Sequence, residues 1–308
     1  MYQRQPTTQR DVINLLLGLF FIGLQLFQLF ALPTWLLPQN PAWGWWLLFP
    51  AVLTTSWWAF IHESIHGCLF SNRHLNRMAG RINAILFGSP YDLLRWGHLL
   101  HHAYSRTERE RPEVYMPGSV SMAWCKLTYY FRLLGGLYLF EVLGGMLLLL
   151  PKPLLKIAIH TISRPDNVVE LLSDKILMPR TLAIARIEAI CILLVYGVAF
   201  SLYGEFAWIL IIALLARGGL ISLVDNMFHY ATPLEQGRYA HNLYLPVWWS
   251  RFILHFNLHG IHHLHPNVSC WQLPNLHAES GHQYQGRWMQ AMAAQFKGPV
   301  AFDQFKED

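Results

Sequence analysis

The sequence predicts an all-α integral membrane protein with four transmembrane helices, a cytoplasmic helical cap that carries clustered histidines, and a re-entrant or interfacial segment near residues 127–150. Of the 308 residues, 54% are hydrophobic and only 13% are charged, with a mean hydropathy of +0.26. Soluble domains carry about 25% charged residues. The 16 histidines nearly equal the 18 acidic residues in number, and many of them gather at the ends of apolar stretches.

Four apolar stretches are long enough to cross a bilayer, whose core of about 30 Å requires about 20 apolar residues in a helix. They are residues 12 to about 37, 43–61, 187–203 and 206–224. The first is too long for a signal peptide and lacks the usual small-residue cleavage site. No linker divides the chain, so we expect a single membrane domain over residues 1–308.

A fifth apolar stretch, residues 127–150, contains Arg132, Glu141 and two Gly pairs. A crossing here would place the basic residues between 152 and 186 outside, against the positive-inside rule. If the segment re-enters or lies along the interface, all Lys and Arg except Arg132 and Arg217 fall on the cytoplasmic side. We therefore expect a multi-pass protein of a bacterial inner membrane, with both termini and the histidine clusters cytoplasmic. The net charge of +5 is then explained by basic residues on one side of the membrane, where they are attracted to anionic lipid headgroups, and it requires no nucleic-acid partner.

Three histidine clusters have helical spacing, so each presents its imidazoles on one helix face. They consist of His62 and His66, of His98, His101 and His102, and of His259, His262 and His263. Imidazole is the commonest metal ligand among side chains. Eight such ligands are too many for one tetrahedral zinc ion, so the clusters predict two metal ions with open coordination positions. The four cysteines form no CxxC pair, so they indicate neither a zinc knuckle nor a disulfide framework.

Several other side chains are candidates for the same site. His229 follows the last apolar stretch and is the natural ninth ligand. His255 precedes His259 by four residues, so it is a further ligand, a hydrogen-bond partner of a ligand, or an ordinary helix residue. Glu63 and Asp225 adjoin ligands, and we expect each to orient an imidazole N–H or to bind metal. The remaining six histidines require no metal.

Aromatic and charged residues near the clusters have two interpretations each. The aromatic residues Trp57, Trp58, Phe60 and Trp96 line a channel for an apolar substrate, or they are interfacial and lipid-facing side chains. The alternating charges of residues 106–111 receive an acidic partner, or they form a solvated helix face with i,i+3 and i,i+4 pairs. The solvated face is the favoured reading of this run.

The motifs as a set resemble those of the integral-membrane fatty acid desaturase and hydroxylase superfamily, over roughly residues 45–275. Residues 62–67, HESIHG, are similar to its first histidine box. Residues 98–102, HLLHH, preceded by FGSP at 87–90 and by Arg95-Trp96, resemble the second. Residues 262–266, HHLHP, followed by Leu273-Pro274, resemble the third.

The resemblance has a second component and some departures. Residues 225–230 are similar to the Asn-xxx-His-Tyr element of membrane alkane monooxygenases, with Asp225 in place of Asn. Arg111 replaces the first acid of the acid-Pro-acid run that often follows the second box. Ser269 stands where Pro is common, and Glu63 where Asp is usual. These departures affect the subfamily rather than the superfamily.

The resemblance implies two iron ions, O2, and electrons from a separate donor such as ferredoxin, rubredoxin or cytochrome b5, because no His-Pro-Gly-Gly run of a fused cytochrome b5 is present. The implied reaction is desaturation of a fatty acyl chain carried by a lipid, acyl carrier protein or CoA. A fatty acid or alkane hydroxylase, an acetylenase and a decarboxylase that forms terminal alkenes remain open. The Leu-Pro closure favours desaturation, whereas residues 225–230 favour hydroxylation. A metal transporter is a remote alternative, because its ligands would lie near the bilayer midplane rather than at span ends.

Overall fold

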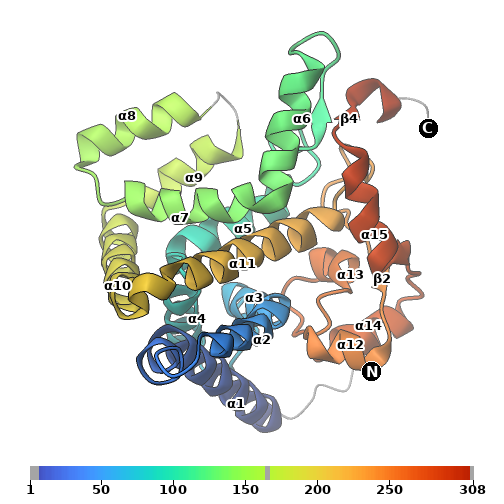
Figure 1. The fold of residues 1–308 in the computed structure, drawn as a ribbon. Helices are drawn as coiled ribbons and strands as arrows, with labels where there is room; N and C mark the ends of the chain where they lie inside the picture. The colour runs from blue at the N-terminus through green and yellow to red at the C-terminus, as the bar shows by residue number, and fades with distance from the viewer. Residues whose placement is uncertain (1–6, 164–166, 306–308) are drawn as a thin grey trace.

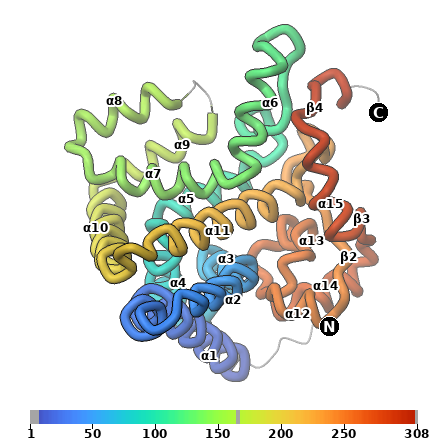
Figure 2. Tube along the Cα trace, viewed as in Figure 1, coloured from blue at the N-terminus to red at the C-terminus, as the bar shows by residue number. Residues whose placement is uncertain are grey.

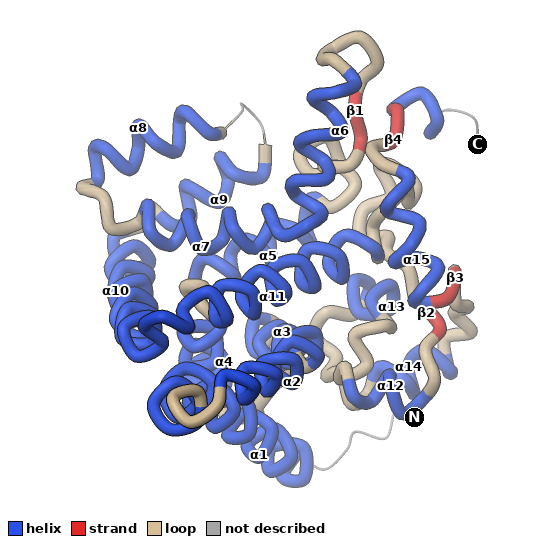
Figure 3. Tube along the Cα trace, viewed as in Figure 1, coloured by secondary structure: helices blue, strands red, loops and turns tan. Residues whose placement is uncertain are grey.

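The computed structural model describes residues 7–163 and 167–305, and helices make up most of them (Figure 3). The α-helices are α1 (Thr7–Leu26), α2 (Leu48–Val52), α3 (Thr54–Ile65), α4 (Arg73–Phe87), α5 (Tyr91–Tyr104), α6 (Met122–Phe131), α7 (Leu137–Leu147), α8 (Lys152–Ile162), α9 (Val168–Ile176), α10 (Pro179–Tyr203), α11 (Ala207–Met227), α12 (Val247–Phe252), α13 (His259–Leu264), α14 (Leu273–Glu279) and α15 (Trp288–Ala294).

The other elements are short. The π-helical segments are η1 (Phe27–Leu36) and η3 (Arg132–Gly136), and the 3₁₀ segments are η2 (Pro41–Leu47), η4 (Gly204–Phe206), η5 (Gln295–Lys297) and η6 (Phe302–Phe305). The strands are β1 (Val114–Tyr115), β2 (Leu243–Tyr244), β3 (Gly286–Arg287) and β4 (Val300–Ala301). They form two small parallel pairs, β1 with β4 and β2 with β3. Both pairs attach C-terminal segments to earlier parts of the chain.

Three helical stretches of the described residues are long and apolar enough to cross a membrane. They are Thr8–Leu36, Met122–Leu147 and Pro179–Met227. The last contains α10 and α11, which are joined by η4 at Gly204, so it holds two of the four spans predicted from sequence. The prediction of a mostly helical protein with helices long and apolar enough to span a membrane is therefore confirmed, whereas the number of four crossings stays a prediction.

The other two apolar regions differ from a simple helix. The predicted span over residues 43–61 is divided among η2, α2 and α3, with Asn40 capping the first of these and a break at Leu53. The segment predicted as re-entrant or interfacial lies mostly within Met122–Leu147. Its helix is interrupted in η3, where Leu134 and Gly135 leave helical dihedral angles. Gly135 has a φ of 124°, a conformation that residues with a Cβ rarely adopt.

Helix α11 runs through the middle of the molecule, with η3 and α7 on one side and α2 and α3 on the other (Figure 1). Glycines lie where α11 contacts η3 and α7: a Cβ added at Gly218 would lie 3.2 Å from Cδ1 of Tyr138, and Gly135 is required by its positive φ. Small residues allow such contacts between membrane helices. This packing brings the C-terminal end of α11 toward α5 and α13, as the tube in Figure 2 shows.

Arg217, one of the two basic residues inside apolar stretches, is buried on α11 and contacts residues of four earlier helices. Its guanidinium donates to the carbonyl of Phe87 at 3.1 Å, to the hydroxyl of Tyr196 at 3.1 Å and to Oε1 of Gln25 at 3.4 Å. It also lies 5.1 Å from the ring centre of Trp57. Arg217 therefore joins α1, α3, α4, α10 and α11 in one polar contact.

Replacement of this arginine should destabilise the fold. We expect Arg217→Met to lower the free energy of unfolding by about 1–3 kcal/mol, because it leaves buried hydrogen-bond acceptors without a donor. Thermal unfolding in detergent micelles measures this. Leu215→Met on the same helix, at a side chain that is 68% exposed, is the control and should leave the melting temperature unchanged. Equal melting temperatures for the two variants would contradict the structural role of Arg217.

Candidate metal centre

Nine histidines from four segments meet at the centre of the molecule. Helix α3 carries His62, and His66 follows its last residue. Helix α5 carries His98, His101 and His102, and α13 carries His259, His262 and His263. His229 lies two residues after the end of α11. In Figure 1 these segments lie together behind the middle of the ribbon. Seven of the nine are buried, and His66 and His101 are half-buried.

The nine side chains form two groups in which one nitrogen of each ring lies within 4.8 Å of those of the others. The first group holds His62, His66, His98, His102 and His262. The second holds His101, His229, His259 and His263. The structure thus brings together all eight cluster histidines and His229, and it divides each of the second and third clusters between the two groups.

The distances between ring nitrogens fit metal coordination better than hydrogen bonding. In the first group, Nε2 of His98 lies 2.9 Å from Nε2 of His66 and 3.0 Å from that of His102, which lies 3.2 Å from Nε2 of His262. A ring nitrogen holds either one hydrogen or one lone pair. Two such neighbours therefore cannot both be hydrogen-bonded to it along the ring plane. Ligand nitrogens about 2.0–2.1 Å from a metal and at right angles would lie about 3 Å apart, as observed.

A buried nitrogen without a hydrogen-bond partner also indicates metal coordination. Nε2 of His62 is buried and has no hydrogen-bond partner among the described residues, although it belongs to the first group. In the second group, Nε2 of His101 lies 3.0 Å from that of His229, and His259 and His263 lie 3.1 Å apart at the same atoms. The residues present therefore fit two metal ions, one for each group.

Burial keeps most of these imidazoles in the neutral form that binds metals. It lowers the pKa of His66 to about 3 and that of His102 to about 2. Burial also lowers the pKa values of six others well below their usual range, namely His62, His98, His229, His259, His262 and His263. His101 differs: burial acts against its charged form, but the carboxylate of Glu110 raises its pKa.

Glu110 is a functional candidate that the sequence did not single out. Nδ1 of His101 lies 2.9 Å from Oε1 of Glu110, so the ring donates to the carboxylate there and turns the lone pair of Nε2 toward the second group. Ser105 makes a similar contact, with its Oγ 3.3 Å from Nδ1 of His229. Glu110 belongs to an alternating run of charges, and nothing in the spacing separates it from Glu108.

The acids predicted to orient imidazoles have different surroundings. Glu63 accepts a hydrogen bond from the backbone N–H of Cys270 at 2.9 Å, which ties the first cluster to the loop after the third. Burial raises the pKa of Glu63 to about 7, and the Cys270 amide opposes this. Asp225 is half-buried one turn before His229, and its charge contributes with Glu110 to raising the pKa of His101.

His255 lies outside both groups of the described residues. Its Nδ1 lies 2.9 Å from Oγ of Ser250, and burial lowers its pKa to about 4. Its φ is 57° and that of Leu254 is 53°, so both residues have a left-handed backbone. Two successive non-glycine residues in this conformation indicate a strained bend of the kind found at functional sites.

The interpretation of residues 106–111 as a solvated helix face is wrong. These residues are not helical, and Arg106 is only 1% exposed with a φ of 69°. Its guanidinium pairs with Glu113 and donates to the carbonyl of Thr232 at 2.6 Å. The sequence pattern was misleading because the charges alternate in the same way on an exposed helix face as in this run. Here, however, Arg106 forms a buried ion pair with Glu113, and Glu110 contacts His101.

The four aromatic channel candidates are packed in two different cores. Trp57, Trp58 and Phe60 lie in the main core, and Trp57 donates from Nε1 to Asn83 at 2.9 Å. Trp96 packs in a separate cluster and lies 4.9 Å from the guanidinium of Arg95. Of the four, Trp58 contacts the imidazoles, with its ring centre 6.4 Å from that of His98 and 6.5 Å from that of His62.

A small pocket adjoins both histidine groups. Its polar lining includes His62 and His262 of the first group and His259 of the second. Its apolar lining comprises Ala59, Leu254, Phe256 and Leu273. None of the four aromatic channel candidates lines it. The pocket thus offers an apolar surface directly beside the nitrogens that fit metal ions.

Comparison with known proteins agrees with this arrangement. A family model described as fatty acid desaturase matches residues 40–291, which is most of the chain and includes all nine histidines. Comparisons with curated proteins and with solved structures gave no significant match.

Loss of the Glu110 carboxylate, which contacts His101, should weaken metal binding at the second group. We expect Glu110→Gln to lower the affinity of one of the two metal ions by roughly 10–100-fold, which is typical for removal of such a partner. Competition with a chelator measures the affinity. The control is Glu108→Gln, because the Glu108 side chain is 83% exposed. If both variants bind metal as the unmodified protein does, Glu110 does not hold His101 for coordination.

Proposed function

Because the chain belongs to the fatty acid desaturase family, we propose that it is a membrane-bound di-iron oxidoreductase that uses O2 and electrons from a separate donor to desaturate a fatty acyl chain. The observation that carries this proposal is the convergence of nine imidazoles in two groups beside a pocket with apolar walls.

Iron is the metal that the family favours among those that imidazole binds. Imidazole suits Fe, Zn, Cu and Ni, so the donor set alone does not select among them. Five nitrogens in one group and four in the other leave coordination positions open if each ion takes six ligands. Two reduced irons would supply the oxidation by O2 of an unactivated C–H bond, which no side chain can achieve.

The protein itself positions the reactants and excludes water. Burial of the imidazoles keeps the site dry, which limits side reactions. Ala59, Leu254, Phe256 and Leu273 place apolar side chains beside the imidazoles, and the strained bend at Leu254 and His255 fixes one wall of the pocket. Glu110 and Ser105 hold His101 and His229 in the orientation that directs Nε2 inward.

For the membrane arrangement we propose four crossings with the histidine groups and both termini cytoplasmic, in a single domain over residues 1–308 and in a bacterial inner membrane. The basic loops support this orientation. Residues 1–6, 164–166 and 306–308 lie outside the described structure, so the terminal ends enter this proposal from sequence alone.

The partners we propose are an acyl substrate carried by lipid, acyl carrier protein or CoA, and an electron donor such as ferredoxin, rubredoxin or cytochrome b5. The excess of Lys and Arg over acidic residues on the proposed cytoplasmic side supports an acidic donor. The alternative reactions are hydroxylation, acetylenation and decarboxylation to a terminal alkene. They would use the same metals and pocket, and they differ in what happens to the substrate carbon after its first hydrogen is removed.

Products from labelled substrate separate these reactions. We expect the reduced protein, supplied with deuterated acyl substrates and ¹⁸O2, to yield a product that has lost two hydrogens and carries no ¹⁸O, as measured by mass spectrometry. A product with ¹⁸O would mean hydroxylation. A product one carbon shorter would mean decarboxylation, and either result would contradict desaturation.

Metal content separates the enzyme from a transporter. We expect about two tightly held irons per chain, because the structure offers two donor groups. His263→Ala removes one nitrogen of the second group and should lower the iron content and abolish turnover. His255→Ala, outside both groups, is the matched control for metal content and should retain both irons. Absence of iron together with ion flux in vesicles would favour the transporter.

A further inference from the structure

The C-terminal residues 295–301, called here the C-terminal clamp, lie beyond the residues that the family model matches. They contact the chain on both sides of His229 and the loop after α5 that contains Glu110, the partner of His101. The clamp comprises η5, Gly298 and β4, and it runs beside α6 and the end of α11 (Figure 1). No residue of the clamp belongs to either histidine group.

Gln295 makes the central contacts. It is completely buried, and its Oε1 accepts a hydrogen bond from Nδ2 of Asn226 at 2.7 Å. Its Nε2 donates to the carbonyl of Leu223 at 3.0 Å. The carbonyl of Gln295 accepts from the hydroxyl of Tyr129 at 2.7 Å. The side chain of Gln295 thus holds the last turn of α11, and its backbone carbonyl joins the same residue to α6.

That turn determines where His229 lies. The carbonyl of Asn226 accepts hydrogen bonds from the backbone N–H groups of His229 at 3.1 Å and Tyr230 at 3.0 Å. The hydroxyl of Tyr230 in turn donates to the carbonyl of Gly298 at 2.8 Å. The clamp therefore holds the residues on both sides of His229, through Asn226 before it and Tyr230 after it.

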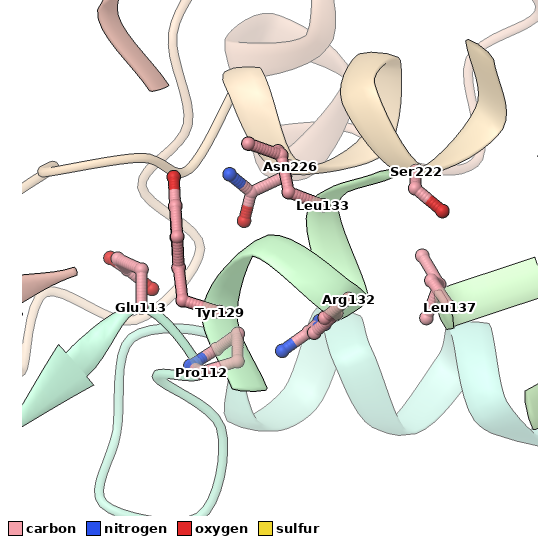
Figure 4. Close-up of a pocket in the computed structure, with 8 residues that line it drawn as sticks. All are labelled: Pro112, Glu113, Tyr129, Arg132, Leu133, Leu137, Ser222 and Asn226. Atoms are coloured by element: carbon pink, nitrogen blue, oxygen red, sulfur yellow. The ribbon is translucent and has the colours of Figure 1, made fainter. Parts of the chain in front are cut away.

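The clamp also reaches the segment that holds His101. β4 pairs with β1, and the N–H of Val300 donates to the carbonyl of Glu113 at 2.8 Å. Glu113 pairs with buried Arg106, whose N–H donates to the carbonyl of Glu110 at 2.9 Å. Figure 4 shows Glu113, Tyr129 and Asn226 around one small pocket, where the segments bound by the clamp meet.

We propose that the C-terminal clamp sets the second metal site, with Gln295 as its positioning residue, while the first site forms without it. The proposal rests on the proposed di-iron function. Its basis is that the clamp holds the chain around His229 and the loop after α5 whose Glu110 contacts His101, and both histidines are in the second group. The five residues of the first group lie on α3, α5 and α13 or directly after α3, and within residues 7–163 and 167–305 no residue of the clamp is hydrogen-bonded to these helices.

The test compares Gln295→Met, which keeps the length of the side chain and removes its hydrogen bonds, with Gln283→Met. Gln283 is exposed and donates only within its own loop, to Gly281. After anaerobic iron loading, Gln295→Met should retain about one iron per chain and show the Mössbauer spectrum of a single site, whereas Gln283→Met should retain about two. His229→Ala should also retain about one, and its combination with Gln295→Met should lose no more.

Hydrogen exchange of the metal-free protein provides a second readout. Backbone amides of residues 222–232 should exchange at least about tenfold faster in Gln295→Met than in Gln283→Met. Tyr230→Phe, which removes a single hydroxyl, should show the same change to a smaller degree and serves if Gln295→Met does not fold. The proposal would be overturned if Gln295→Met and Tyr230→Phe bind two irons and their backbone amides exchange as in the unmodified protein. Loss of both irons from these variants would also overturn it. If the unmodified protein binds fewer than two irons, the di-iron function fails, and exchange alone decides the clamp.

Discussion

Burial of nine imidazoles with converging nitrogens is the constraint on which the rest of the structure depends. Buried polar atoms without partners are costly, and Nε2 of His62 is one of them. Nε2 of His98 and of His102 each have two nitrogen neighbours at about 3 Å, which hydrogen bonds cannot satisfy together. Metal ions remove both the unpartnered nitrogen and the crowding of nitrogens, because the lone pair of each nitrogen can then bind a cation.

The fold meets this constraint by fixing four separate segments around one point. Gly135 and Gly218 lie where α11 contacts η3 and α7, and Arg217 connects α11 to the helices before it. The residues beyond α11 then need support of their own. Glu110 and the C-terminal clamp provide it for the second group, whereas the first group lies on or directly after helices.

Sequence alone predicts the helical membrane class and all nine histidines, because helical spacing gives each cluster a common face and apolar stretches are visible in composition. It does not predict how the clusters are divided between groups, since that depends on the rotation of α5 and α13 about their axes. It also fails for Arg106 and Glu110, whose burial results from tertiary contacts with Glu113 and His101. The break at Leu53 likewise lacks a strong local signal.

The central claim is that two irons are held by nitrogen ligands from two separate groups of histidines. X-ray absorption of the fully iron-loaded protein at the iron edge tests it most directly. We predict a first shell dominated by imidazole nitrogen at about 2.1 Å, with the outer-shell scattering of imidazole rings and about two irons per chain. A shell dominated by carboxylate oxygen or by sulfur, or a single iron per chain, would contradict the account.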